Sequence, residues 1–364
     1  MYVSAPREDL FQKLPKLVQG FITWISGIPA SAQQNRLPMT PMLVIGIGLA
    51  SIVIGFTFVS TAIEAGGGGG IALYLIGFCC VAGGMRRLDV LIIHQTLHAK
   101  VLRTPSQNRI LGEFLTTVLL RTPYLENQKE HLGHHRAPCD ENDVDVIFLR
   151  QAGVATAKSK ESLYFRIFLI AFSPAFHLRF FYNRIVGNFV TARPLHRLAI
   201  SWTYGAALLA PTFFYGSSYL IALTLYWLIP LSVGFQMSNF LYTATKHRWW
   251  LFGNETVRGK EKRDLLSFAR VCCSEAPEND TFTGWTVWWL EALFFHLPVR
   301  LFIVVGDTVQ HDLHHVAPTC DWPNSAYERQ RYNSLRPERF TEVWGGMLAH
   351  LKECNLEGQF HVND

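Results

Sequence analysis

Residues 198–245 read LAISWTYGAALLAPTFFYGSSYLIALTLYWLIPLSVGFQMSNFLYTAT and contain no Asp, Glu, Lys or Arg. An α-helix needs about 20 apolar residues to cross the ~30 Å hydrocarbon core of a membrane, so this block is long enough for two crossings. Gly216–Ser218, near its middle, favour a turn. We therefore expect a helical hairpin made of Leu198–Tyr215 and Tyr219–Leu241.

A second block has the same character. Residues 42–84 contain one charged side chain, Glu64, and are interrupted by the glycine run Gly66–Gly70. They predict a first hairpin, Met42–Ile63 with Ile71–Ile93. Charged residues make up only 17% of the 364-residue chain, whereas soluble domains have about 25%, and 49% of the residues are hydrophobic, which excludes a disordered chain. The fold class predicted is an all-α integral membrane protein with four transmembrane helices in two hairpins.

The basic residues predict the topology. All 33 Lys and Arg lie in 1–41, 85–197 and 246–364, which two hairpins would place on one side of the membrane. The positive-inside rule makes that side cytoplasmic, and the N-terminus lacks the pattern of a cleaved signal. We expect a multi-pass protein of a bacterial inner membrane with both termini in the cytoplasm. The expected parts are an N-terminal segment (1–41), hairpin 1 (42–93), a cytosolic region (94–197), hairpin 2 (198–241) and a cytosolic helical cap (242–364).

Several stretches outside the hairpins are rich in Phe, Trp and Leu but are punctuated by charges. Such segments suit helices that lie in the membrane interface with their apolar side down. The alternative is a third hairpin, but a spanning 282–305 would bury Glu291 and His296 in the membrane. The stretches are 10–29, 109–122, 163–190 and 282–305.

Nine of the 14 histidines form a pattern that indicates metal binding. One group has the spacing His-x-x-x-His, two groups have the spacing His-x-x-His-His, and one histidine follows hairpin 2. Residues at i, i+3 and i+4 share a helix face, so each group can direct several imidazoles at one centre. Imidazole is the commonest protein ligand for iron, copper and zinc, and nine imidazoles exceed what one ion can hold. The predicted ligands to two metal ions are His94, His98, His131, His134, His135, His247, His311, His314 and His315.

These histidine groups carry a resemblance to a known family. His94-Gln-Thr-Leu-His98, His131-Leu-Gly-His134-His135 and His311-Asp-Leu-His314-His315 are similar to the histidine boxes of the membrane fatty acid desaturase and hydroxylase superfamily. The resemblance covers roughly residues 42–335 and includes the stretch after His315. Members have four spanning helices and a cytosolic cap that houses a histidine-ligated non-haem di-iron centre.

The resemblance implies the chemistry. Two iron ions and O₂ would oxidise an unactivated C–H bond of a long-chain acyl or alkyl substrate, with desaturation as the leading reaction. Hydroxylation, ring oxidation of the carotenoid type and oxidative decarboxylation of a free fatty acid to a terminal alkene share the same boxes. His247 matches the isolated extra ligand of many members. Stearoyl-type desaturases have an asparagine one turn before that ligand, where this chain has Thr243, and Asn239 lies a further turn back.

Carboxylates that orient metal-bound imidazoles are expected near the boxes. Asp89 is favoured because it precedes His94 by five residues, next to Arg86 and Arg87. The acidic run 140–145 fits an equivalent role or a solvated loop. The further candidates by sequence proximity are Asp140, Asp143, Asp145, Asp307 and Asp312.

The source of electrons is expected to be a separate protein. The seven cysteines include no Cys-x-x-Cys pair, and the sequence has no His-Pro-Gly-Gly haem motif and no Gly-x-Gly-x-x-Gly segment. A ferredoxin-, rubredoxin- or cytochrome b5-type donor, with its reductase, would dock on the basic cytoplasmic face, since the net charge is +5. The other expected partners are the substrate and the lipid bilayer, with no nucleic acid.

A non-enzymatic function remains as the alternative. The histidines of a membrane metal carrier or sensor could bind zinc or copper in transit. Against transport, the predicted topology places the box histidines at helix ends and not along a path through the membrane. Metal analysis distinguishes the two classes, since an enzyme of this kind would retain about two irons per chain.

Overall fold

The computed structural model describes residues 4–154, 157, 159–249 and 259–353, and nearly all of its regular structure is helical. Two compact units make up the chain. The first unit consists of residues 1–40, 133–168 and 241–364, and the second unit of residues 41–132 and 169–240. The all-α prediction is confirmed, because the only strands in the described part are two of two residues each.

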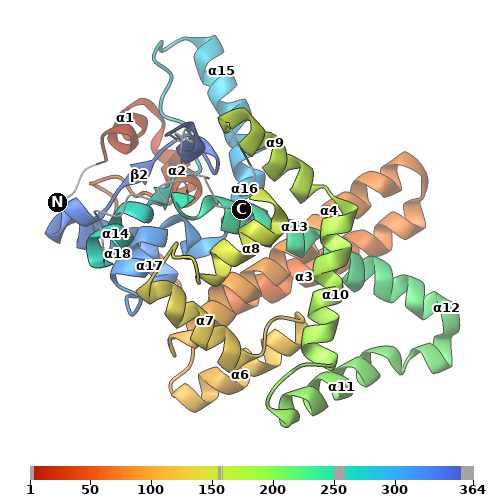
Figure 1. Ribbon diagram of the computed structural model, residues 1–364. Helices are drawn as coiled ribbons and strands as arrows, with labels where there is room; N and C mark the ends of the chain where they lie inside the picture. The colour runs from red at the N-terminus through yellow and green to blue at the C-terminus, as the bar shows by residue number, and fades with distance from the viewer. Residues whose placement is uncertain (1–3, 155–156, 158, 250–258, 354–364) are drawn as a thin grey trace. The chain divides into compact units, whose positions relative to one another are not determined.

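The second unit contains the long apolar helices (Figure 1). Among the described residues, three helices are long and apolar enough to span a membrane: Pro41–Ala65, Gly67–Leu97 and Thr212–Thr245. Two of them include short π-helical segments, and the last continues into the first unit. The helices that lie wholly or partly in this unit are α3 (Pro41–Ala65), α4 (Gly67–Arg87), η2 (Leu88–Ile93), α5 (His94–Leu97), α6 (Pro105–Val118), α7 (Tyr124–Arg136), α9 (Lys160–Ala171), α10 (Pro174–Phe189), α11 (Leu195–Leu209), α12 (Thr212–Leu223), η4 (Thr224–Leu228), η5 (Pro230–Gly234) and α13 (Phe235–Thr245).

The second expected hairpin differs from the structure in its first arm. The segment predicted as Leu198–Tyr215 forms α11, which ends at Leu209, and Pro211 precedes the next helix. At 15 residues α11 is shorter than a membrane crossing requires. The predicted turn is present as a break at Gly216, where φ is 58°. A further crossing is offered by α9 and α10, which together are long and apolar enough for one but are bent by 60°. This pair covers most of the stretch 163–190.

The first hairpin is packed through glycines at seven-residue intervals. A Cβ atom on Gly70, Gly77 or Gly84 of α4 would lie 2.6–2.7 Å from a carbonyl oxygen of α3, namely that of Ala62, Gly55 or Gly48. The two backbones therefore approach as closely as glycine allows, which is how small residues stabilise helix pairs in membranes. The turn is shorter than predicted: Gly66 and Gly67 have positive φ values, and Gly70 already packs against the Ala62 carbonyl of α3.

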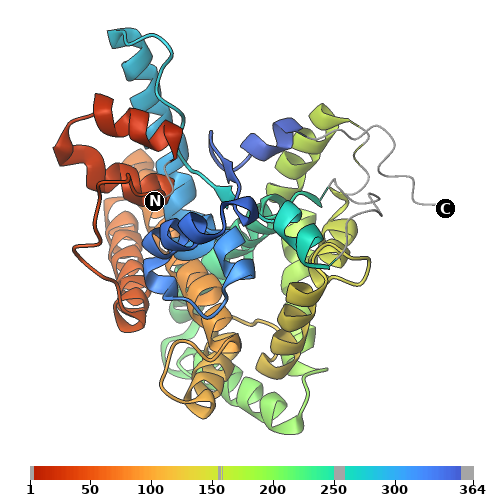
Figure 2. The same cartoon turned by 90° about the vertical axis from the view of Figure 1, so that its left-hand side faces the viewer.

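The first unit is built from short helices around two parallel strands. β1 (Ala269–Arg270) pairs with β2 (Glu342–Val343), and Gln310 bridges to Ala269. The N-terminal helices, red in Figure 2, lie against C-terminal segments, shown in blue, because Gln310 donates to the Gly27 carbonyl and Asn35 to Asn324. Its helices are α1 (Ala5–Lys13), η1 (Lys16–Val18), α2 (Gln19–Ser26), α8 (Val144–Ala152), α14 (Gly259–Leu266), α15 (Phe282–Glu291), η7 (Ala292–His296), α16 (Leu297–Phe302), η8 (Gly306–Val309), α17 (His311–Val316), η9 (Trp322–Asn324), α18 (Ser325–Leu335), η10 (Pro337–Arg339) and η11 (Ala349–Glu353).

The apolar core of this unit joins its two ends. Leu10, Ile22 and Ile25 from the N-terminal helices are buried against Val271 and Trp288. A smaller cluster contains Cys272, Val299, Val304, Val309 and Met347. The segment that follows β1 and the segment that precedes α17 therefore have fixed places in the core.

The glycine seam of the first hairpin leads to a stability prediction. Gly77→Ala places a methyl group against the α3 backbone and should destabilise the protein by about 1–3 kcal/mol, as overpacking does. Gly69→Ala is the matched control in the same helix, because its Cβ meets nothing within 4 Å. The measurement is the thermal unfolding midpoint in detergent. Equal midpoints for the two variants would contradict the close approach of α3 and α4.

Candidate metal centre

Helix α7 carries three of the predicted ligands. His131, His134 and His135 follow one another at helical spacing near its C-terminal end. The boundary between the two units falls within this helix, after Leu132, so His131 belongs to the second unit and the other two to the first.

The first unit contains a cluster of four buried imidazoles. His134, His247, His311 and His315 come from three distant segments, and one nitrogen of each lies within 4.8 Å of those of the others. The Nε2 atom of His247 is 3.1 Å from that of His134 and 3.1 Å from that of His311. The Nε2 atoms of His311 and His315 are 3.2 Å apart. The isolated histidine, His247, thus joins members of the second and third boxes.

These distances match the donor spacing around one metal ion. An ion bound at about 2.0–2.1 Å by imidazole nitrogens holds neighbouring nitrogens about 3.0–3.4 Å apart. Four neutral Nε2 lone pairs directed at one point repel one another unless a cation lies between them. The donor set, all imidazole and fully enclosed, fits iron, copper or zinc. The four residues therefore fit one metal ion in donor type, in burial and in the spacing of three neighbouring nitrogen pairs.

The opposite ring nitrogens of two ligands have acceptors. Nδ1 of His134 lies 2.8 Å from Oδ2 of Asp143, and Nδ1 of His247 lies 3.3 Å from the Leu266 carbonyl oxygen. A proton on Nδ1 satisfies these contacts and leaves the Nε2 lone pair for the metal. Asp145 is 3.4 Å from the same Nδ1 of His134 and also pairs with Lys246, the residue before His247.

Asp143 is itself held in place by the backbone. Its carboxylate accepts hydrogen bonds from the Cys139 and Asp145 amides at 2.7 and 3.0 Å, and the latter bond caps the start of α8. Burial acts to raise the pKa of Asp143, but the hydrogen bond with His134 and the charge of Lys246 outweigh it, so this pKa is lowered. Asp143 is therefore a preformed anionic acceptor for a metal-bound imidazole.

Burial also sets the protonation of the predicted ligands. Desolvation lowers the pKa values of His247, His311 and His315 well below the ordinary value, and the charges of Lys246 and Arg270 add to the effect at His247 and His311. At neutral pH these imidazoles are neutral, which is the form that binds a metal.

The second unit contains a separate group of three. Nε2 of His98 lies 2.7 Å from Nε2 of His131, and the His94 ring is 4.5 Å from the His131 ring, centroid to centroid. Nδ1 of His94 lies 3.1 Å from the Val90 carbonyl oxygen, within the π-helical segment η2. Burial and the charge of Lys100 lower the pKa of His98 to about 4. π-Helical turns are frequent at functional sites, and this one directly precedes the first box.

Two predicted ligands remain, and both lie in the first unit. Nε2 of His135 and Nε2 of His314 are 2.8 Å apart. His135 also lies 4.5 Å from His315, ring centroid to ring centroid. All nine predicted histidines thus have another box imidazole as a close neighbour in their own unit.

Four of the residues that were expected to support the metal ligands have other partners in the structure. Asp89 forms ion pairs with Arg86 and Arg121 at 3.2 and 3.0 Å, and Arg86 also donates to Asn239. Asp312 is paired with an arginine, described below. The carbonyl oxygen of Thr243 accepts from the Trp249 indole at 2.9 Å. The roles of these four residues at the metal stay predictions.

Asp143 is the carboxylate that the sequence did not single out. It stood among several acids of the run 140–145, for which a solvated loop was equally acceptable. Its position in the sequence could have indicated it. Asp143 directly precedes an apolar helical stretch, as an N-cap residue does, and it follows His134 by nine residues with a turn between them.

A comparison with protein-family models matches residues 70–344 to the fatty acid desaturase family. The matched range contains all nine histidines and covers about three quarters of the chain. A comparison with curated proteins found no match.

The family match and the clustered box histidines agree with the resemblance seen in the sequence. The chain belongs to the fatty acid desaturase family.

Proposed function

We propose that this protein is a membrane-bound non-haem di-iron enzyme that uses O₂ to oxidise an unactivated C–H bond of a long-chain fatty acyl or alkyl substrate, with desaturation as the leading reaction. The family supports fatty acid desaturation or a related oxidation. The observation that carries the proposal is the cluster of His134, His247, His311 and His315, whose buried nitrogens have the spacing of one metal ion.

The proposed ligands of the first iron are these four histidines. His94, His98 and His131 of the second unit are proposed as ligands of a second iron. His135 and His314, which neighbour each other in the first unit, are proposed as further metal ligands. A reduced iron pair supplies, with O₂, an oxidant strong enough to remove hydrogen from an alkyl carbon. The residues of the chain hold the metals: Asp143 keeps the His134 proton on Nδ1, and the Leu266 carbonyl does the same for His247.

Other oxidations remain as alternatives within this class. Fatty acid or alkane hydroxylation, and oxidative decarboxylation of a free fatty acid to a terminal alkene, need the same metals and differ in the fate of the substrate radical. The chain length, the head group and the position of attack depend on how the substrate is held near the metals.

A metal carrier or sensor is the alternative from a different class. A carrier must release its metal, so its ligands should be accessible and free to move. The four-histidine cluster instead has exposed fractions of 0–4%, and Asp143 fixes one of its rings. These observations favour a resident metal and hence the enzyme.

The metal assignment predicts the composition of the purified protein. Protein expressed with sufficient iron should contain about two irons per chain by elemental analysis and should consume O₂ when reduced in the presence of a fatty acid. His134→Ala removes one ligand and should lower the iron content and abolish O₂-dependent turnover. His196→Ala is the control, because His196 is exposed and outside the boxes. Exchangeable zinc without O₂ consumption would favour the carrier, and retained turnover in His134→Ala would remove His134 from the ligand set.

The products distinguish the reactions. Mass spectrometry of the lipids and volatile hydrocarbons of expressing cells should show acyl chains two hydrogens lighter, absent from cells that express His134→Ala. Hydroxylated chains would instead indicate hydroxylation, and terminal alkenes one carbon shorter than the acid would indicate oxidative decarboxylation.

We further propose that the protein is an integral membrane enzyme with its metal site on the cytoplasmic side, and that a separate ferredoxin-, rubredoxin- or cytochrome b5-type protein reduces it. This topology takes residues 198–215, and not α9 with α10, as the third crossing. The absence of Lys and Arg from 42–84 and 198–245 supports it, and the net charge of +5 suits an acidic donor.

Electrostatic docking predicts a salt dependence. At subsaturating donor, turnover should fall severalfold between about 20 mM and about 500 mM ionic strength, because salt screens the attraction between the proteins. A small-molecule reductant is the control and should show little change. Turnover with the protein donor that is insensitive to salt would contradict docking on a basic face.

A further inference from the structure

We propose that Arg329 is a positioning residue for the metal centre: through Asp312 it fixes the direction of helix α17, which carries His311 and His315. This inference rests on the proposed function in one respect, namely that the four-histidine cluster binds a metal ion. It concerns only residues of the first unit.

Helix α17 is too short to be stable by itself, so its orientation depends on contacts with its surroundings. It consists of six residues, His311–Val316, and isolated helices of this length are not stable in water. Its three histidines lie on one face at positions i, i+3 and i+4, and Asp312 projects about 100° around the helix from His311. A contact at Asp312 therefore controls the rotation of the helix about its axis without occupying the face that binds metal.

Arg329 makes that contact in a rigid form. Its Nε atom lies 3.0 Å from both carboxylate oxygens of Asp312, and its Nη2 atom lies 2.7 Å from Oδ2. Both side chains are buried, with exposed fractions of 1–2%. A planar guanidinium paired with a carboxylate in this way fixes orientation as well as distance, which a lysine cannot do.

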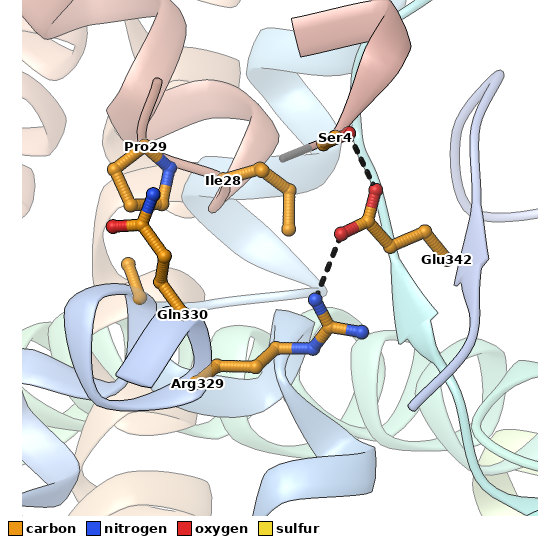
Figure 3. Close-up of a pocket in the computed structure, with 7 residues that line it drawn as sticks. Ser4, Ile28, Pro29, Arg329, Gln330 and Glu342 are labelled. Carbon is orange, nitrogen blue, oxygen red and sulfur yellow. Dashed lines mark hydrogen bonds and ion pairs between the residues drawn. The ribbon is translucent and has the colours of Figure 1, made fainter. Parts of the chain in front are cut away.

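The other side of the guanidinium is anchored to the body of the unit. Nη1 of Arg329 donates to Glu342 of β2 at 2.9 Å, and the second Glu342 oxygen accepts from the Ser4 hydroxyl at 2.7 Å (Figure 3). Trp344 also donates to Glu342. Arg329 therefore connects the ligand helix to a strand and to the start of α1, and it cannot turn with α17.

Two further hydrogen bonds act on the backbone before the helix. Arg270 donates to the Thr308 carbonyl at 3.0 Å, and Gln310 donates to that of Gly27. They place the first residue of α17. Among the ion pairs of the described residues, Asp312–Arg329 is the one that a residue of α17 forms. Asp312 lies between His311 and His315 in the sequence. Once His311 is placed, this pair therefore fixes the direction of the His315 side chain.

Titration with Co²⁺ tests the proposal on the full-length protein in detergent, after removal of bound iron. Co²⁺ is the probe because its visible absorption reports the number and geometry of its ligands. We expect Asp312→Asn and Arg329→Lys to weaken Co²⁺ binding at one site about 10–100-fold, as the loss of contacts behind metal ligands does, and to change the spectrum of that site. The double variant should lose no more than the stronger single variant, because the two residues act as one unit.

Two controls separate positioning from general stability. Arg7→Lys makes the same substitution at an arginine that is also buried in the first unit but bonds to Ile28 and Thr23; it should lower the unfolding midpoint and leave the Co²⁺ affinity unchanged. Arg331 lies on the same helix as Arg329 and forms an exposed pair with Glu328. Arg331→Lys should change neither the unfolding midpoint nor the Co²⁺ affinity.

The Co²⁺ affinity and spectrum of the variants decide whether the proposal holds. Wild-type affinity and spectrum in Asp312→Asn and Arg329→Lys would refute it, as would an equal loss of affinity in Arg7→Lys. If Arg329→Lys does not fold, Asp312→Asn decides, since it keeps the size of the side chain. Failure of the wild-type protein itself to bind Co²⁺ would instead contradict the proposed function.

Discussion

The structure of the first unit depends on bringing four imidazole nitrogens to one point. Each of the four Nε2 atoms has at least one of the others at 3.1–3.2 Å, closer than neutral lone pairs tolerate without a cation or a shared proton between them. Burial makes protonation unfavourable, as the lowered pKa values of His247, His311 and His315 show. A metal ion removes this conflict, because it accepts all four lone pairs and needs no water around it.

Charged contacts around the cluster hold the rings against this repulsion. Asp143 fixes His134 from behind, and Lys246 with Asp145 ties the residue before His247 to the same acidic loop. Arg329 and Asp312 fix the short helix α17. Each of these pairs is buried or nearly so, and removing one partner would leave a charge without compensation, which is costly in a low-dielectric interior. The polar groups behind the histidines therefore preserve the geometry of the cluster.

Much of this arrangement is readable from the sequence, because hydropathy and histidine spacing are local signals. The uncharged blocks predict long helices, and the boxes predict which imidazoles gather, including the isolated His247. The limits of the helices are less predictable. Residues 198–215 are as apolar as a spanning helix, but α11 ends at Leu209, just before Pro211. The turn of the first hairpin is confined to the start of the run Gly66–Gly70, because Gly70 already packs against α3.

Closeness in the sequence does not reveal which charged residues pair with each other. Asp89 is the acid nearest the first box, yet two arginines engage it, one of them 32 residues away. Asp312 lies inside the third box but points to Arg329. Asp143 reaches His134 because a turn and a helix cap bring it there. Such pairings depend on which elements pack together, and a single sequence carries little information about that.

The central claim is that histidines are the protein ligands of the metal. X-ray absorption spectroscopy of the iron-loaded protein tests it most directly. The account predicts a first shell of nitrogen and oxygen atoms at about 2.0–2.2 Å with the outer-shell scattering of several imidazoles. A sulfur scatterer at about 2.3 Å, or iron that lacks imidazole scattering, would contradict it.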